Sequence, residues 1–133
     1  MTTTYFANCV MGNLFKTKTS PGLPSAFYVG LSKTAPTVSG GNVTEPSDKA
    51  YARVKLSSLS APANGMINNT SPIAFSDSTT DWGTITHFVI YDAPTGGNLL
   101  IYNTLDKSRT IQADSQVAFK ASGLRLTLKD VAS

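Results

Sequence analysis

Cysteine, histidine, tryptophan and charge are all scarce in this chain of 133 residues. Cys9 is the lone cysteine, and charged residues make up 14% of the chain, against an average of about 25%. A lone cysteine excludes an intrachain disulfide and a thiolate metal cluster. No apolar run reaches the length of a membrane span, and the N-terminus MTTTYFANCVMGN lacks the basic and apolar regions of a secretion signal. We therefore expect synthesis in the cytoplasm and no membrane insertion.

The residues that enzymes use are missing or badly spaced. A zinc site would need His87 with carboxylates, but neither H-x-x-x-H nor C-x-x-C spacing is present. The G-x-S-x-G turn of serine hydrolases is absent, and a glycosidase needs two carboxylates across a cleft, whereas Glu45 is the only glutamate. A calcium site at Asp77 and Asp81 is an alternative, although DSTTD lacks the EF-hand pattern. We predict no catalytic, metal-binding or cofactor-binding residue, and no enzyme.

The basic residues are dispersed along the chain, whose net charge is +3. Three pairs are spaced two or four residues apart, so a strand would point both members to one solvated face: Arg53 and Lys55, Lys107 and Arg109, Arg125 and Lys129. Nucleic-acid binding needs a denser basic patch with aromatic residues beside it. We therefore predict no nucleic-acid partner. The low charge also suits a surface that is covered by other copies or other proteins.

The apolar pattern predicts one helix near the N-terminus, capped by Thr4 and ending around Lys16. Its apolar stripe consists of Tyr5, Phe6, Cys9, Val10, Leu14 and Phe15. The following segment TKTSPGLPS contains two prolines and a glycine, which end a helix. The stripe either covers the protein's own sheet or anchors the chain to a neighbour.

Short alternating segments predict strands in the rest of the chain. A long polar loop, residues 33–49, separates the first two of them, and 57–72 is expected to hold a weak strand with turns. The strands are expected at Ala26–Leu31, Tyr51–Leu56, Ile73–Phe75, Thr84–Tyr91, Asn98–Thr104, Gln116–Phe119 and Leu124–Lys129. This spacing predicts an all-β fold, a β-sandwich or jelly-roll-like single domain over 1–133, with a helix and connector at 1–18 and a β-domain at 26–130.

The strand that contains the histidine is expected to be covered on both faces. Alternation places on one face Thr84, Thr86, Phe88 and Ile90, and on the other Ile85, His87, Val89 and Tyr91. With apolar neighbours on its own face, His87 is predicted to be structural. In the strand Tyr51–Leu56 the buried face is expected to consist of Ala52, Val54 and Leu56.

The order of motifs resembles short structural proteins of tailed phages, often labelled tail fibre or virion proteins. The similarity extends from about Tyr5 to Lys129, through FYVGLSKTAPT, TEPSDKAYARV, DWGTITHFVIYDAPTGGNLLIY and LRLTLK. Its most specific parts are Gly30–Pro36, Glu45–Ser47 with Tyr51–Val54, and Trp82–Gly83 with His87–Phe88. The segment Ser57–Ser71 is irregular and departs from the pattern.

This resemblance implies a non-enzymatic structural component of a tailed-phage virion, foremost a tail or tail-fibre protein. Capsid decoration is an alternative, as is a module whose loop 33–49 binds a host receptor or glycan. The loop has no aromatic residue between Tyr28 and Tyr51, which favours the structural role. The implied partners are other virion proteins, further copies of the chain and a possible host receptor.

Overall fold

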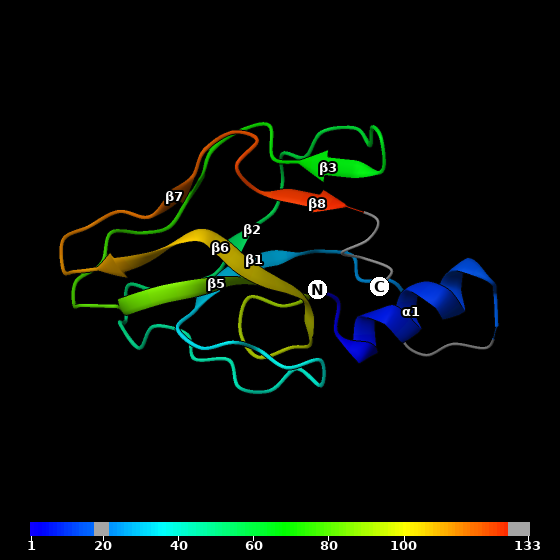
Figure 1. Ribbon diagram of the computed structural model, residues 1–133, viewed down its shortest axis with the longest axis horizontal. Coiled ribbons are helices and arrows are strands. Elements are labelled where there is room, and N and C mark those ends of the chain that lie inside the picture. The colour runs from blue at the N-terminus through cyan, green and yellow to red at the C-terminus, as the bar shows by residue number, and fades with distance from the viewer. Residues whose placement is uncertain (18–21, 128–133) are drawn as a thin grey trace.

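Antiparallel strands form most of the regular structure in the computed structural model, which describes residues 1–17 and 22–127 (Figure 1). The elements are α1 (Thr4–Leu14), β1 (Tyr28–Ser32), β2 (Val54–Lys55), β3 (Met66–Asn68), β4 (Ile73–Ala74), β5 (Gly83–Tyr91), β6 (Leu99–Ile111), β7 (Ala118–Phe119) and β8 (Arg125–Thr127). The predicted all-β class with one short N-terminal helix is confirmed. Residue 18 of the expected connector and residues 128–130 of the expected β-domain lie outside the described residues.

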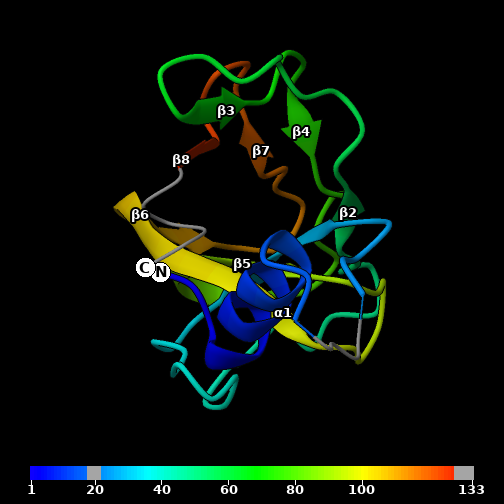
Figure 2. The ribbon, with the colours of Figure 1, turned by 90° about the vertical axis from the view of Figure 1, so that its right-hand side faces the viewer.

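The strands form two layers. One is a four-stranded antiparallel sheet in the order β2-β1-β5-β6, and the other consists of the two-stranded ribbons β3–β8 and β4–β7. Figures 1 and 2 show both ribbons on the same side of the four-stranded sheet, while the loop 33–49 runs along its opposite side. The two layers thus make a small sandwich.

Apolar side chains fill both faces of the four-stranded sheet. Between the layers lies the main core, which includes Leu31, Phe75, Trp82, Ile85, Phe88, Ile90, Leu100 and Leu124. On the opposite face Val89, Tyr91, Leu99 and Tyr102 pack together, with Val43 from the loop 33–49 against them. Each fully buried side chain of this size contributes about 1.5–3 kcal/mol. The expectation that β5 is covered on both sides is confirmed.

A bulge changes which side chains of β5 share a face. Ile85 pairs with Arg109 and His87 pairs with Thr104, so residues 105–108 of β6 oppose Thr86 alone. Ile85 lies in the main core with Phe88 and Ile90, whereas Val89 and Tyr91 pack on the opposite face, so the prediction that Ile85 shares a face with these two residues is wrong. Simple alternation fails here because a bulge bends the strand and shifts its register. The extra residues of the bulge follow Thr104, where β6 was predicted to end.

The N-terminal segment fastens the helix to the edge of β6. The amide of Thr3 donates to the Leu100 carbonyl at 3.0 Å, and Thr2 forms a bridge with Ile101. The cap of α1 is Thr3, not the predicted Thr4, and its Oγ1 accepts from the Phe6 amide at 3.3 Å while donating to Leu99 O at 2.7 Å. One hydroxyl thus caps the helix and ties it to the sheet.

The helix buries only part of its apolar stripe. Phe6 and Cys9 are buried in the main core, whereas Leu14 and Phe15 are 64% and 65% exposed. In Figures 1 and 2 the helix projects beyond the end of the sheet, which leaves its last turn without a covering layer. Within residues 1–17 and 22–127, no helix has the length and apolar character needed to cross a membrane.

The strand around residue 54 differs most from its prediction. Only Val54 and Lys55 have strand geometry, because β2 pairs with just two residues of β1 at the edge of the sheet. Ala52 is exposed, although it was expected on the buried face. The Arg53 side chain, expected to be solvated, is only 6% exposed. Both assignments were wrong, and the contacts of Arg53 explain why.

Candidate functional site

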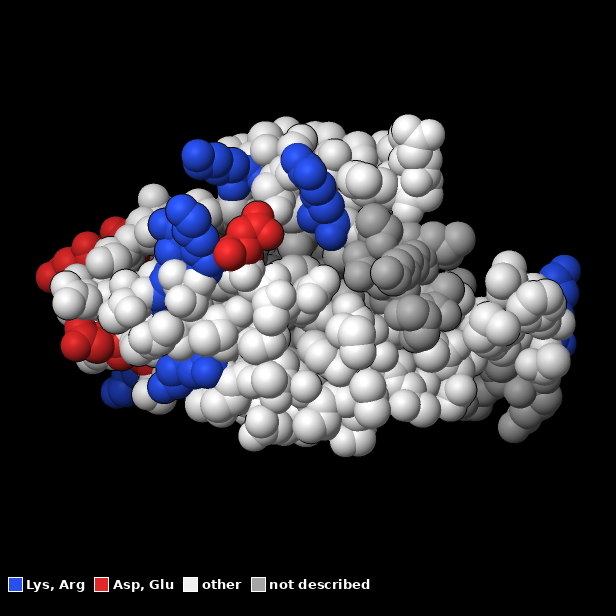
Figure 3. All heavy atoms as spheres, in the orientation of Figure 1, with Lys and Arg blue, Asp and Glu red and all other residues white. Residues whose placement is uncertain are grey.

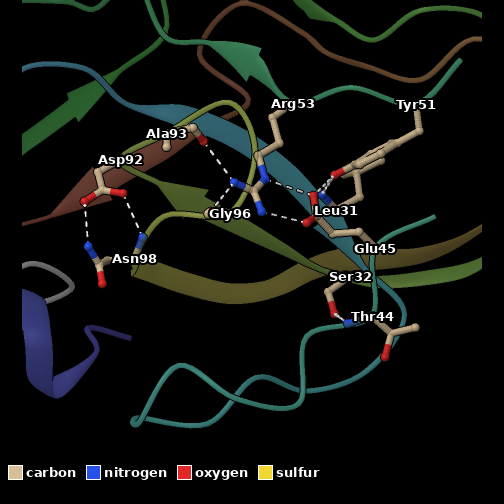
Figure 4. Close-up of polar contacts among 10 residues, drawn as sticks. All are labelled: Leu31, Ser32, Thr44, Glu45, Tyr51, Arg53, Asp92, Ala93, Gly96 and Asn98. Carbon is tan, nitrogen blue, oxygen red and sulfur yellow. Dashed lines mark hydrogen bonds and ion pairs between the residues drawn. The ribbon is translucent and has the colours of Figure 1, made fainter. Parts of the chain in front are cut away.

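Arg53 forms a two-pronged ion pair with Glu45. Its Nη2 donates to Glu45 Oε1 at 2.7 Å, and its Nε donates to Glu45 Oε2 at 3.1 Å. The planar guanidinium matches the carboxylate in this geometry, which is stronger than a single contact. Glu45 lies in the loop 33–49, so the pair joins this loop to the chain just before β2 (Figure 4).

The remaining nitrogen of Arg53 holds the hairpin loop between β5 and β6. Its Nη1 donates to the carbonyls of Ala93 at 2.9 Å and Gly96 at 2.8 Å. The guanidinium carbon also lies 3.6 Å from the centre of the Tyr91 ring, within the range of a cation–π contact. Figure 4 shows the contacts of Arg53 with Glu45 and with the two carbonyls of the hairpin loop. We call Glu45, Arg53 and Tyr91 the arginine clasp.

The hairpin loop is also braced at its base. Asp92 accepts from the Asn98 amide at 2.7 Å and from its side-chain amide at 3.1 Å. Gly97 has φ +73°, and a Cβ there would lie 2.6 Å from Asp92 Oδ1. A side chain at this position would be both strained and obstructed. The shape of the loop 92–98 therefore depends on two sets of contacts, those of Arg53 with its carbonyls and those of Asp92 with Asn98.

Tyr51 extends the clasp to β1. Its hydroxyl donates to Glu45 Oε2 and accepts from the Leu31 amide at 2.9 Å. Burial, together with the hydrogen bond to Glu45, raises the pKa of Tyr51 far above its usual value, so the hydroxyl stays protonated. A Cβ at Gly30 would lie 2.8 Å from this hydroxyl, so only glycine lets the tyrosine approach β1 so closely.

A second cluster of hydrogen bonds is centred on Asp48, and we call this cluster the aspartate node. Its carboxylate accepts from the amides of Ala50, Thr79 and Thr80, at 3.0, 2.6 and 3.1 Å, and from the Thr79 hydroxyl. Trp82 Nε1 donates to Asp48 Oδ2 at 2.9 Å. These hydrogen bonds, with that of the Thr79 hydroxyl the largest cause, hold the pKa of Asp48 far below its usual range.

His87 has one hydrogen-bonding partner of its own, the Thr86 hydroxyl, which lies 2.8 Å from Nδ1. Partial burial lowers the pKa of His87, which favours the neutral ring at neutral pH. Among the hydrogen bonds of the described residues, no carboxylate is paired with the ring. The structural role predicted for His87 fits this geometry and stays a prediction.

Asp81, one of the two aspartates considered for calcium, accepts a hydrogen bond from the backbone. Asp81 Oδ1 accepts from the Ala113 amide at 2.9 Å and so joins the ends of β5 and β6. Over residues 1–17 and 22–127, no cluster of three or more histidine, cysteine or acidic side chains could hold a metal ion. The predicted absence of metal and cofactor sites stays a prediction, since a site needs testing with the ion itself.

The loop 33–49 has a defined path although it contains no regular element. The Lys33 amide donates to Thr44 O at 2.9 Å, and the Thr44 amide donates to Ser32 Oγ at 3.1 Å (Figure 4). Farther along, Val38 O accepts from the Thr4 amide at 2.9 Å, which joins the loop to the start of α1. The two carboxylates that fasten the molecule thus project from a loop that is itself held at both ends.

Comparison with known protein families identifies the chain. The family model of the podophage GP4 fiber I protein gp80 matches residues 1–127. The chain belongs to this family of phage fibre proteins. The match confirms the resemblance to tailed-phage fibre proteins noted in the sequence. No curated protein matches the chain.

The motifs that carried the resemblance are the two fastenings of this fibre protein. Glu45 and Arg53 belong to the clasp, which Tyr51 extends to β1. Trp82 donates to Asp48 in the aspartate node. Sequence analysis missed both, because Arg53 was assigned to a solvated face and no contact was predicted for Asp48. A signal was available in the uniqueness of Glu45 and Trp82, the only residues of their kinds.

Proposed function

We propose that this fibre-family protein is a non-enzymatic structural component of the phage tail, built as one domain and assembled onto other virion proteins. It is made in the host cytoplasm before assembly. The observation that carries the proposal is the use of its acidic and basic motif residues. Glu45, Asp48 and Arg53 are engaged in hydrogen bonds within the molecule, and these bonds hold its loops.

Loops that are held by hydrogen bonds give the molecule a surface of fixed shape for binding. Ordering a loop before binding removes the entropy cost that a partner would otherwise have to offset. The clasp orders the hairpin loop 92–98, and the hydrogen bonds of Thr44 and Val38 order the loop 33–49. These properties suit a protein that is placed repeatedly in the same position on a particle.

The test is to label purified particles with an antibody against the chain and to image them by electron microscopy. Label on the tail or its fibres supports the proposal. Label distributed over the head would show capsid decoration, and absence of label from intact particles would contradict a structural role. Particles grown without the gene should lack the labelled density, which controls for cross-reaction.

Receptor recognition is distinguished by adding the purified chain to host cells. A receptor-binding module would bind the cells and compete with phage adsorption. A structural component leaves adsorption unchanged, because its contacts are with the particle. The lack of an aromatic residue in the loop 33–49 supports the second outcome, since glycan sites commonly present aromatic rings.

A further inference from the structure

A groove of about 240 Å³ lies between the edge strands of the two layers. Residues 54–58, which include β2, line one side of it, and residues 71–74, which include β4, line the other. Both segments lead away from one hydrogen bond, in which the Thr70 amide donates to Ser58 O at 2.8 Å. Figure 2 shows β4 on the side of the ribbon β4–β7 that is nearer to β2. We call this space the edge groove.

The outer edge of β2 has a backbone amide and a carbonyl that its own sheet does not use. The Leu56 amide donates to Phe27 O at 2.8 Å, and the pairing of β2 with β1 continues from there. Because successive residues of an antiparallel strand turn these groups to opposite sides, Lys55 turns both of them away from β1. Among the strands of the described residues, β1 is the one partner of β2. The outer side of β2 is therefore open to a further strand.

The outer edge of β4 has the same arrangement. The Phe75 amide donates to Val117 O at 2.9 Å, so Ala74, one residue earlier, turns its amide and carbonyl away from β7. In the part of the chain that the structure describes, β4 pairs with β7 alone. Open strand edges bind extended peptides through backbone hydrogen bonds. A peptide in the edge groove would meet Lys55 on one side and Ala74 on the other.

The side chains of the edge groove suit a peptide that carries both apolar and acidic residues. Three apolar side chains, which also pack in or against the main core, line it: Val54, Leu56 and Ile73. Lys55 is exposed and is the one charged residue in the lining. Its ammonium has no ion pair within residues 1–17 and 22–127. A carboxylate on the bound peptide would complement this charge.

We propose that the edge groove binds an extended segment of another virion protein, which adds a strand between β2 and β4 and places a carboxylate beside Lys55. The inference rests on the proposed function, because it names a contact through which the chain is assembled. β2 and β4 each consist of two residues, so neither edge alone offers a long ladder. A segment that fits between them gains hydrogen bonds on both of its sides, which selects against other strands.

Charge favours a different protein over a second copy as the source of this segment. The chain has a net charge of +3, and Glu45 and Asp48 are already engaged within the molecule. On the face that Figure 3 shows, acidic side chains gather toward the left end and at one point nearer the middle, and most of the surface carries none. A more acidic neighbour therefore complements Lys55 better than a copy does.

The experiment treats purified particles with a carbodiimide, which joins an amine to a carboxylate that it contacts, and identifies the linked peptides by mass spectrometry. The expected product joins Lys55 to an aspartate or glutamate of another virion protein. A product that joins Lys55 to a second copy of the chain would overturn the inference. The absence of any product at Lys55 would overturn it as well.

Particles that carry Ala74→Pro test the backbone contacts. Proline removes the outward amide and places its ring at the edge of the groove, while the hydrogen bonds between β4 and β7 remain. The yield of the Lys55 product is expected to fall about tenfold. Ala118→Pro is the matched control, since Ala118 lies opposite Ala74 in the ribbon, is exposed and does not line the groove. An unchanged yield for Ala74→Pro, or an equal loss for the control, contradicts the inference.

Hydrogen exchange gives a measurement that needs no variant and so does not depend on how Ala74→Pro folds. The amides of Lys55 and Ala74 should exchange more slowly in particles than in the isolated chain, and equal rates would refute the added strand. Particle labelling separates this result from the proposed function. A chain that labels the tail with both amides unprotected contradicts the strand alone. A chain that is missing from particles contradicts the structural role and the inference that rests on it.

Discussion

The arginine clasp and the aspartate node are two solutions to the same problem, placed three residues apart in one loop. Each uses a carboxylate to hold distant segments of chain. Glu45 is neutralised by the guanidinium of Arg53, whereas Asp48 accepts from backbone amides, the Thr79 hydroxyl and the Trp82 indole. The first depends on an opposite charge, and the second depends on oriented dipoles.

Removing a hydrogen-bond donor should therefore have different consequences in the arginine clasp and in the aspartate node. In the clasp, loss of Arg53 removes at once the opposite charge beside Glu45, which keeps only the hydrogen bond from Tyr51, and the donor to the Ala93 and Gly96 carbonyls. In the node, loss of one donor leaves Asp48 with several others. We therefore expect the clasp to fail abruptly and the node to weaken gradually. The four predictions below test this comparison, from the largest effect to the smallest.

Replacing Arg53→Met should lower the free energy of unfolding by about 3 kcal/mol, since breaking a buried pair leaves Glu45 uncompensated. Urea unfolding followed by circular dichroism measures it. The matched control is Lys55→Met, which removes the same charge two residues later from an exposed position and should change stability by less than about 0.5 kcal/mol. Equal effects of the two variants would show that charge, and not the clasp, is responsible.

Replacing Trp82→Phe should lower the free energy of unfolding by about 2 kcal/mol, because the indole donor to the Asp48 carboxylate is lost. The phenyl ring of the variant keeps an apolar, buried side chain at this position. Asp48→Asn should also destabilise, and the double variant should lose less than the sum of the two single variants. Additive losses in this double-mutant cycle would mean that the two residues stabilise the fold independently, which contradicts the node.

Acid should act on the node through Asp48. Its pKa is lowered in the folded chain, so the unfolded chain, with a pKa of about 3.9, binds a proton first as the pH falls. The stabilisation is therefore fully present above about pH 5 and is lost progressively below that. Unfolding curves from neutral pH downward should show a steeper loss for the natural chain than for Asp48→Asn. Parallel curves would contradict the assignment.

His87 provides the smallest expected effect, because the ring has one hydrogen-bonding partner and is only partly buried. Its pKa is lowered in the folded chain, so the unfolded chain protonates first as the pH falls through about 6.5, and stability declines. His87→Gln should remove this decline between about pH 8 and pH 5. Loss of a hydrolytic activity in the same variant would instead make His87 catalytic.

Much of the fold could be predicted because alternation and turn residues act locally. The hairpin of β5 and β6 follows from β-branched and aromatic runs around DAPTGG, and the structure confirms it. Strand lengths were less predictable, since β2 has only two paired residues and β6 runs on to Ile111. Those limits depend on where a neighbouring strand ends, and no local pattern records that.

The candidate site was largely beyond prediction. Alternation gives the face to which Arg53 points, but not the presence of Glu45 and a hairpin loop in front of it. The helical stripe likewise predicts which residues align, although Phe6 is buried and Phe15 is exposed. Periodicity cannot tell how far the supporting sheet extends beneath a helix. The bulge opposite Thr86 is a third case of the same kind.

The sequence by itself determined the class of the fold, the order of its elements and the scarcity of residues able to perform catalysis. These follow from composition and from periods of two and 3.6 residues, which depend only on near neighbours. The tertiary structure decided that the arginine just before β2 is buried, that Asp48 holds Trp82, and that the loop 33–49 is joined to the start of α1. Those features depend on contacts between distant segments, and only the folded chain brings them together.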